Sequence, residues 1–126
     1  MNTKRVGNQG ENIVRGHLLR LGWTVLESNF RCPSGEMDLI AEEPGRLAPT
    51  LVFVEVKTRR GRGHGTPAEA VDARKQQRLA AVAQAYLGKR SAGGEEPQCR
   101  FDVVEVEIGV DGLASVTLRR AAFAME

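Results

Sequence analysis

A short apolar run that carries two charged residues constrains this chain more than any other feature. Residues 51–60 read LVFVEVKTRR, and the apolar residues that begin the run predict a buried β-strand. Glu55 interrupts the apolar run, and Lys57 follows two positions later. Because burial of a carboxylate or an ammonium group is costly unless the group is paired or bound to a metal ion, this strand requires partners for both side chains.

Length and composition predict one globular domain over residues 1–126. The 41% hydrophobic and 27% charged residues argue against a disordered or a membrane protein. No apolar run approaches the roughly 20 residues that cross a bilayer, and we expect no secretory signal at the N-terminus. Cys32 and Cys99 lack metal-site spacing, so we expect reduced thiols in a cytoplasmic protein, although the sequence leaves a disulfide between them open.

Two helices are expected. The first is predicted over residues 8–21, because Asn8 and Glu11 have capping-box spacing and Gly22 follows as a stop. The second is predicted over residues 66–87, because its first four residues, TPAE, combine a capping box with proline at the first helical position.

Five strands are expected as well, which predicts an α/β fold with a mixed sheet flanked by helices in the order α-β-β-β-α-β-β. The second and third strands are expected to form an antiparallel hairpin with a long connection. The last two strands are expected to pair through a turn at Asp111 and Gly112, and residues 30–35 to form a loop. The predicted strands cover residues 23–28, 36–43, 50–58, 101–109 and 115–119.

The alternation of side chains along a strand predicts which residues share a face. In the strand at 50–58, the odd-numbered side chains lie on one face, and these include Glu55 and Lys57. In the strand at 36–43, the even-numbered side chains, including Asp38, share a face, and Met37 is expected on the opposite one with the other odd-numbered residues. A one-residue slip would scatter both sets. The predicted register pairs Asp38 with Glu55, Ile40 with Phe53 and Glu36 with Lys57.

Carboxylates that converge at the end of a hairpin have a specific chemical use. Oxygen ligands with nothing softer nearby suit a hard cation such as Mg²⁺, and the main-chain carbonyl of Val56 is a further candidate ligand. Such a cation activates water and neutralises phosphate charge, while Lys57 orients the attacking water or stabilises the transition state. Asp38, Glu55 and Lys57 therefore form a sensible set for phosphodiester hydrolysis, and a structural salt-bridge cluster is the alternative.

Basic residues gather after the same strand. From Lys57 to Arg78 the chain carries seven basic and two acidic residues, a local net charge of +5, although the whole chain carries only +2. Such a patch attracts phosphate backbones, and a solvated charged surface is the alternative. The glycine-rich residues 61–67, GRGHGTP, also suggest nucleotide binding, but they lack the G-K-[ST] ending of a P-loop.

The motifs GEMDLI at residues 35–40 and VEVK at residues 54–57 together resemble the paired signature of the PD-(D/E)XK nuclease superfamily. More closely, the chain resembles the YraN-like family of small bacterial proteins, which are described as predicted endonucleases. The resemblance covers most of the domain, including GTPAEAVDARKQQRL at residues 65–79 and RFDVV at residues 100–104. Met37 stands where the superfamily label has proline. The resemblance implies a restriction-endonuclease-like fold.

The resemblance also implies roles for individual residues. The implied catalytic residues are Asp38, Glu55 and Lys57. The implied metal ligands are Asp38, Glu55 and the Val56 carbonyl, with Glu11 on the first helix as a further candidate. The expected supporting residues are Glu36 and either Gln76 or Gln77, a choice that the sequence leaves open. The candidate DNA contacts are Arg59, Arg60, Arg62, Lys75 and Arg78.

Taken together, these features predict a Mg²⁺-dependent DNA endonuclease, with Mn²⁺ as a substitute cation, that acts on duplex or branched DNA. With one Trp, one Tyr and four Phe, stacking platforms for single strands are scarce. Symmetric cleavage of a duplex would favour a homodimer. The alternative is a module that uses the same fold to bind nucleic acid or a partner protein without cutting, but binding alone calls for Lys and Arg rather than buried acids.

Overall fold

The computed structural model describes residues 3–60, 71–90 and 96–123. Five strands form one mixed sheet in the order β1-β2-β3-β4-β5, where β3 and β4 run parallel and the other neighbours antiparallel. The predicted element order is confirmed. In chain order the elements are α1 (Thr3–Arg20), β1 (Thr24–Cys32), β2 (Gly35–Glu43), β3 (Thr50–Arg60), α2 (Ala73–Arg90), β4 (Gln98–Ile108) and β5 (Ala114–Phe123).

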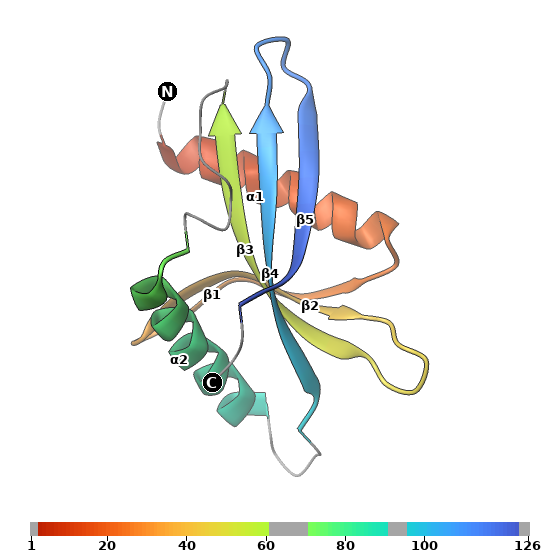
Figure 1. Ribbon diagram of the computed structural model, residues 1–126, viewed down its shortest axis with the longest axis vertical. Helices are drawn as coiled ribbons and strands as arrows, with labels where there is room; N and C mark the ends of the chain where they lie inside the picture. The colour runs from red at the N-terminus through yellow and green to blue at the C-terminus, as the bar shows by residue number, and fades with distance from the viewer. Residues whose placement is uncertain (1–2, 61–70, 91–95, 124–126) are drawn as a thin grey trace.

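The two helices cover opposite faces of a strongly twisted sheet (Figure 1). Leu18 of α1 belongs to one buried apolar cluster, and Leu79 of α2 belongs to the other. Strand β3 contributes to both, because Val54 lies in the α1 cluster and Phe53 in the α2 cluster, each fully buried. A strand covered on both faces needs apolar residues on both, which explains the continuous apolar run that begins β3.

Helix α1 begins earlier than the sequence predicts. It starts at Thr3, so Asn8 lies inside the helix and the predicted capping box is wrong. No proline precedes Asn8 to stop a helix. The other end is as predicted, because Gly22 has a φ of 89° and the N–H of Trp23 donates a hydrogen bond of 3.0 Å to the carbonyl of Leu18. This is the usual glycine-terminated end of a helix.

Helix α2 begins later than predicted. Val71 and Asp72 are not helical, so the prediction of one helix from residue 66 is wrong, and the TPAE segment itself lies outside the described residues. Asp72 is the cap: its Oδ1 accepts a hydrogen bond of 2.9 Å from the N–H of Lys75. Aspartate is among the best residues for that position. The helix also continues past Gly88 to Arg90.

The hairpins are tighter and longer than predicted. Only Pro33 and Ser34 separate β1 from β2, so the loop predicted at residues 30–35 is wrong. The cross-strand hydrogen bonds extend almost to the turn, and Gly35 with a φ of 144° opens β2. The turn at Asp111 and Gly112 joins β4 and β5 as predicted.

The register between β2 and β3 is confirmed where Ile40 faces Phe53. The paired residues run from Glu43 and Thr50 to Leu39 and Val54, and there β2 leaves β3. The predicted pairing of Glu36 with Lys57 is therefore wrong. Glu36 instead lies opposite Arg31 of β1, with 3.6 Å between the carboxylate and the Arg31 Nε.

The alternation of β2 breaks at the same point. Met37 is fully buried in the α2 cluster together with Ile40, whereas Leu39 lies in the α1 cluster. The prediction that Met37 and Leu39 share a face is therefore wrong. Beyond Leu39, β2 pairs with β1 alone, and there the Met37 side chain packs in the α2 cluster, against the alternation of a regular strand.

Two expectations from composition have structural counterparts. Cys32 and Cys99 are free thiols. Burial raises the pKa of the Cys99 thiol, which makes it a poor nucleophile. Neither helix in the described part of the chain is long and apolar enough to cross a membrane.

Candidate active site

The candidate site lies where β2 separates from β3. Asp38 is the first residue of β2 beyond the paired segment, and its Oδ2 accepts a hydrogen bond of 2.8 Å from the N–H of Val56. A side chain thus bonds to a main-chain donor of β3 beyond the point where the ladder stops. This bond fixes the Asp38 carboxylate beside Glu55, the residue before Val56.

Asp38 and Glu55 form a pair of carboxyl groups in direct contact. Glu55 is buried, with 5% of its surface exposed, and a side-chain hydrogen bond links it to Asp38. Burial of Asp38, followed by the charge and the hydrogen bond of Glu55, raises the pKa of Asp38 to about 8. Two carboxylates in contact cannot both ionise without a cation, so this pair holds a proton or calls for a positive charge.

Two lysines contact the same oxygen of Glu55. The Nζ of Lys57 lies 3.8 Å from Glu55 Oε2, and the Nζ of Lys75, from the first turn of α2, is in contact with that atom. Burial and the neighbouring Lys75 ammonium lower the pKa of Lys57. Burial alone would lower the pKa of Lys75, but the hydrogen bond to Glu55 and the other interactions with Lys57, Glu55 and Asp38 together raise that pKa.

Glu11 approaches this cluster from α1. Burial raises the pKa of Glu11, and the charges of Glu36 and Glu55 add to the rise against a hydrogen bond to Asn29. The approach depends on Gly10, because a Cβ built at Gly10 would lie 1.8 Å from the Oγ1 of Thr58 on β3. Glycine therefore lets α1 pack closely against β3 at the site.

The cluster offers few ligands to a metal ion. Among the described residues, no three side chains of Asp, Glu, His or Cys are grouped closely enough to hold a cation by themselves. Asp38 and Glu55 are the two donors in contact, and Glu11 stands further off. Mg²⁺ is commonly bound by one or two carboxylates and keeps several water ligands, so a site with two carboxylates suits the usual coordination of Mg²⁺. The Val56 carbonyl stays a predicted ligand.

The predicted supporting residues lie at the margin of the cluster. Glu36 is exposed and pairs with Arg31. The amide of Gln76 donates a hydrogen bond of 3.0 Å to the carbonyl of Val71, so Gln76 holds the start of α2. Gln77 is exposed, and Gln76 is the more buried of the two.

The candidate DNA contacts divide into different environments. The guanidinium of Arg60 donates a hydrogen bond of 3.3 Å to Gln9. The buried Nε of Arg59 has no hydrogen-bond partner within the described ranges. Arg78 is exposed, whereas Arg62 lies outside the described residues. Lys75 differs from the other candidate contacts because its principal contact is Glu55. Its position in the first turn of α2, after the cap residue Asp72, was a sequence signal that had been overlooked.

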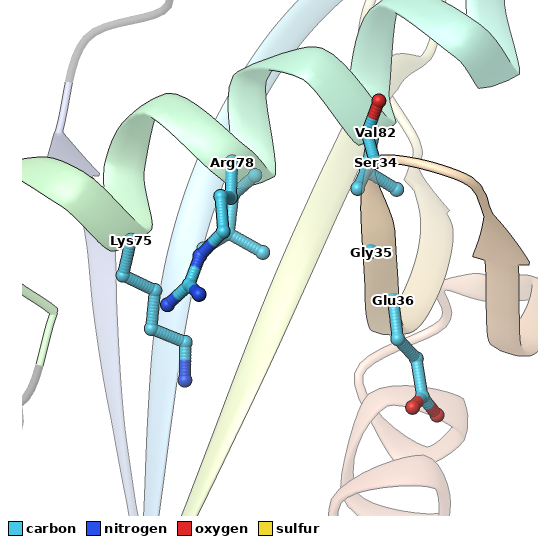
Figure 2. A pocket seen from close by; sticks show the side chains of 7 residues that line it. Ser34, Gly35, Glu36, Lys75, Arg78 and Val82 are labelled. Atoms are coloured by element: carbon cyan, nitrogen blue, oxygen red, sulfur yellow. The ribbon is translucent and has the colours of Figure 1, made fainter.

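A surface cavity of about 280 Å³ opens beside Lys75, between α2 and the β1–β2 turn (Figure 2). Lys75 and Arg78 extend from the helix on one side, and Glu36 extends from β2 on the other. The cavity is lined by Ser34, Gly35, Glu36, Lys75, Arg78, Leu79 and Val82. It combines two basic side chains with the apolar side chains of Leu79 and Val82, and Lys75 connects it to Glu55.

A second charged cluster was not foreseen, although Asp102 interrupts an apolar strand much as Glu55 does. Asp102 is 1% exposed, and its two oxygens accept hydrogen bonds of 2.8 and 2.9 Å from Arg100. Arg100 also donates a hydrogen bond of 2.7 Å to Glu43, and Arg120 donates one of 2.6 Å to the other oxygen of Glu43. The signal in the sequence was the spacing of Arg100 and Asp102, two residues apart on one face of a strand.

The charged side chains of this cluster stabilise one another in their ionised forms. The hydrogen bond to Asp102 raises the pKa of Arg100. Hydrogen bonds from Arg100 and Arg120 outweigh burial and lower the pKa of Glu43. Both guanidinium groups also lie 5.7 Å from the centre of the Trp23 ring. Each acid here has a cationic partner, so the cluster needs no further ligand.

The chain is similar to proteins of several bacteria. A model of the family described as "Uncharacterised protein family UPF0102" matches residues 10–106, which include every candidate site residue. A UPF0102 protein of Symbiobacterium thermophilum is 51% identical over 96% of this chain and 98% of its own length. UPF0102 proteins of Caldanaerobacter subterraneus, at 42% identity over 90% of this chain and 88% of the relative, and of Moorella thermoacetica, at 40% identity over 98% of each, are also similar. The chain therefore belongs to the UPF0102 family.

Proposed function

We propose that this protein is a Mg²⁺-dependent DNA endonuclease of the PD-(D/E)XK type. The observation that carries the proposal is the contact between the half-buried carboxyl group of Asp38 and the buried one of Glu55, with Lys57 3.8 Å from Glu55. A purely structural cluster would be expected to compensate its charges fully, as Arg100 does for Asp102. A perturbed pair of acids next to an exposed basic surface is typical of a functional site.

The chemistry follows from the residues that meet there. Asp38 and Glu55 would hold the Mg²⁺ ion, which supplies an activated water and neutralises charge on the phosphate. Lys57 places a positive charge beside the reacting phosphate, where it orients the attacking water or stabilises the transition state. The lowered pKa of Lys57 also makes its ammonium a better proton donor to the leaving oxygen than an ordinary lysine.

The substrate class follows from the surface around the site. Arg59, Arg78 and the basic residues that follow β3 offer charge to a phosphate backbone. Trp23, the single tryptophan, is 4% exposed and lies against Arg100 and Arg120, so it is not placed to stack on bases. Backbone contacts without stacking favour duplex or branched DNA over single strands.

The test is an assay with labelled linear, nicked and branched DNA in Mg²⁺, Mn²⁺ or EDTA. We expect cleavage in either cation, none in EDTA, and a loss of about 100-fold or more in Asp38→Asn and Lys57→Ala. Lys89→Ala is the matched control, because Lys89 is an exposed lysine in the last turn of α2. Cleavage that survives both site variants would come from a contaminant and would refute the proposal. Binding without cleavage under every cation would replace it with a nucleic-acid-binding module.

A further inference from the structure

Lys75 is placed differently from the other basic residues of the site. Its ammonium group is in contact with Glu55 Oε2, the oxygen that also faces Lys57 at 3.8 Å. One carboxylate oxygen thus has two cationic neighbours. Lys57 belongs to the same strand as Glu55 and is only two residues away, whereas Lys75 reaches the oxygen from a separate helix.

The backbone of Lys75 is fixed while its side chain is not. The Lys75 N–H is bound by the Asp72 cap at 2.9 Å, and Gln76 ties the same turn to Val71 at 3.0 Å. The Lys75 side chain, 29% exposed, runs along the cavity that it shares with Arg78 (Figure 2). Its four-carbon stem can therefore swing from Glu55 into open space without any movement of the helix.

A divalent cation on Asp38 and Glu55 would compete directly with the Lys75 ammonium. Both positive groups would be held by the one carboxylate of Glu55, and at such short range two cations repel strongly. We propose that Lys75 is a displaceable counter-ion, which holds the cation position at Glu55 in the metal-free protein and moves beside Arg78 when a divalent cation binds. There the two basic groups would face a phosphate of the substrate strand. This inference rests on the proposed function, because it takes Asp38 and Glu55 as the metal ligands.

The role assigned to Lys75 is positioning rather than catalytic. Without metal, the contact pairs Glu55 with a cation and withholds that cation from the substrate surface. With metal, the released lysine adds a phosphate contact. Metal binding and DNA binding are thereby coupled through one side chain, and each should strengthen the other.

The first test measures Mn²⁺ affinity by the electron paramagnetic resonance signal of the free ion, for wild type, Lys75→Met, Arg78→Met and Asp38→Asn. We expect Lys75→Met to bind Mn²⁺ on the order of 10-fold more tightly than wild type, because its competitor is gone. Arg78→Met removes a positive charge one turn further along the same helix and should change affinity by less than about 3-fold. Asp38→Asn should abolish binding.

The outcomes separate the two proposals. Equal affinity in wild type and Lys75→Met, with binding lost in Asp38→Asn, would overturn the role of Lys75 and leave the metal site intact. An equal gain in Mn²⁺ affinity in Lys75→Met and Arg78→Met would also overturn it, since the gain would then come from removing any positive charge near the site and not from competition at Glu55. Absence of Mn²⁺ binding in wild type and Lys75→Met alike would overturn the proposed function and this inference with it.

The second test uses the unmodified chain. It contains only four lysines, so the ammonium signal of Lys75 can be followed by ¹⁵N NMR and assigned with Lys75→Arg. We expect a protected signal in the metal-free protein that is lost or shifted at saturating Mg²⁺, as the group leaves Glu55 for solvent. An unchanged Lys75 signal at a Mg²⁺ concentration that perturbs the amide of Val56 would refute the displacement.

Discussion

Two neighbouring strands carry the same kind of pair, an acid and a base two residues apart, yet the two pairs are built differently. On β4, Arg100 donates two hydrogen bonds of 2.8 and 2.9 Å to Asp102. On β3, Lys57 lies 3.8 Å from Glu55. Side chains two apart on a strand share a face, so geometry allows a close pair in both places. The difference comes from the other groups that reach each acid.

Those groups give the two acids opposite electrostatic surroundings. Asp102 also accepts a hydrogen bond of 2.9 Å from the N–H of Ala121, so each of its oxygens has a donor. Glu55 instead faces Asp38, a second acid, and shares one oxygen between two lysines. The first arrangement satisfies a buried charge. The second leaves an acid with a perturbed pKa beside two lysines, an arrangement that is common at functional sites.

The largest expected effect is on the free energy of unfolding, and it distinguishes Arg100 from Lys57. Arg100→Met should lower the free energy of unfolding by about 3–5 kcal/mol, because it leaves Asp102 buried without its cation. Lys57→Met should cost less than about 1 kcal/mol, because Lys75 still contacts Glu55. Urea denaturation of both variants measures the difference. Equal losses would mean that the two pairs are energetically alike and that the comparison fails.

The next effect concerns the packing that brings α1 to the site. Gly10→Ala should destabilise the protein by about 3 kcal/mol, because the new Cβ would lie 1.8 Å from Thr58 Oγ1. Gly88→Ala is the matched control, since a Cβ there meets nothing within 4 Å, and alanine in a helix should stabilise by about 0.5–1 kcal/mol. Thermal unfolding reports both.

A double variant tests the cause of that cost. Thr58→Ala removes the oxygen that the new methyl group would meet, so it should recover part of the loss in Gly10→Ala. If the two losses simply add, the clash with Thr58 is not the reason for the destabilisation.

A third effect concerns Asp38 itself and depends on pH. The folded protein holds the Asp38 proton with a pKa of about 8, well above the value near 3.9 of an unfolded chain. The folded state therefore binds more protons between about pH 4 and pH 8, and Asp38 makes the protein less stable as pH rises through that window. Asp38→Asn should therefore raise stability in EDTA, and the gain should be larger at pH 8 than at pH 5, growing by about 1.4 kcal/mol for each pH unit between them.

Denaturation of wild type and Asp38→Asn at both pH values is the measurement, with Glu27→Gln as a control at an exposed acid of β1. The glutamine variant should follow wild type at each pH. A loss of stability in Asp38→Asn at pH 8 would show that the ionised acid is well compensated, as Asp102 is.

Local pattern was enough to predict much of this architecture. The apolar residues that begin β3 predicted a buried strand, and alternation paired Ile40 with Phe53 correctly. The same reasoning failed beyond Leu39, where β2 no longer pairs with β3 and Met37 packs in the α2 cluster. Where a ladder ends depends on tertiary packing, and no short stretch of sequence records it.

The contact between the two acids was predictable from the sequence, and the basic groups that reach them were not. Asp38 and Glu55 were found from spacing on a hairpin, which is a contact between neighbouring strands. Lys75 reaches Glu55 across 20 residues of chain, and Arg100 reaches Glu43 across 57. The sequence alone does not distinguish the surroundings of Lys75 and Arg100. The packing of α2 and β4 on the sheet gives these two basic residues different partners.

The smallest expected effect concerns Asp72, which can be compared with Asp38 and Asp102. Asp72 is exposed and caps α2 through the N–H of Lys75. Asp72→Ala should cost about 1 kcal/mol, while Asp72→Ser should cost a few tenths, because serine keeps an oxygen that can accept the same bond. Loss of the cap also loosens the turn that carries Lys75. Asp72→Ala should therefore broaden the ¹⁵N NMR signal of the Lys75 ammonium group under conditions where the signals of β4 are still unchanged. A cost as large as that of Arg100→Met would mean that the start of α2, rather than burial of an uncompensated charge, governs the stability of this sheet.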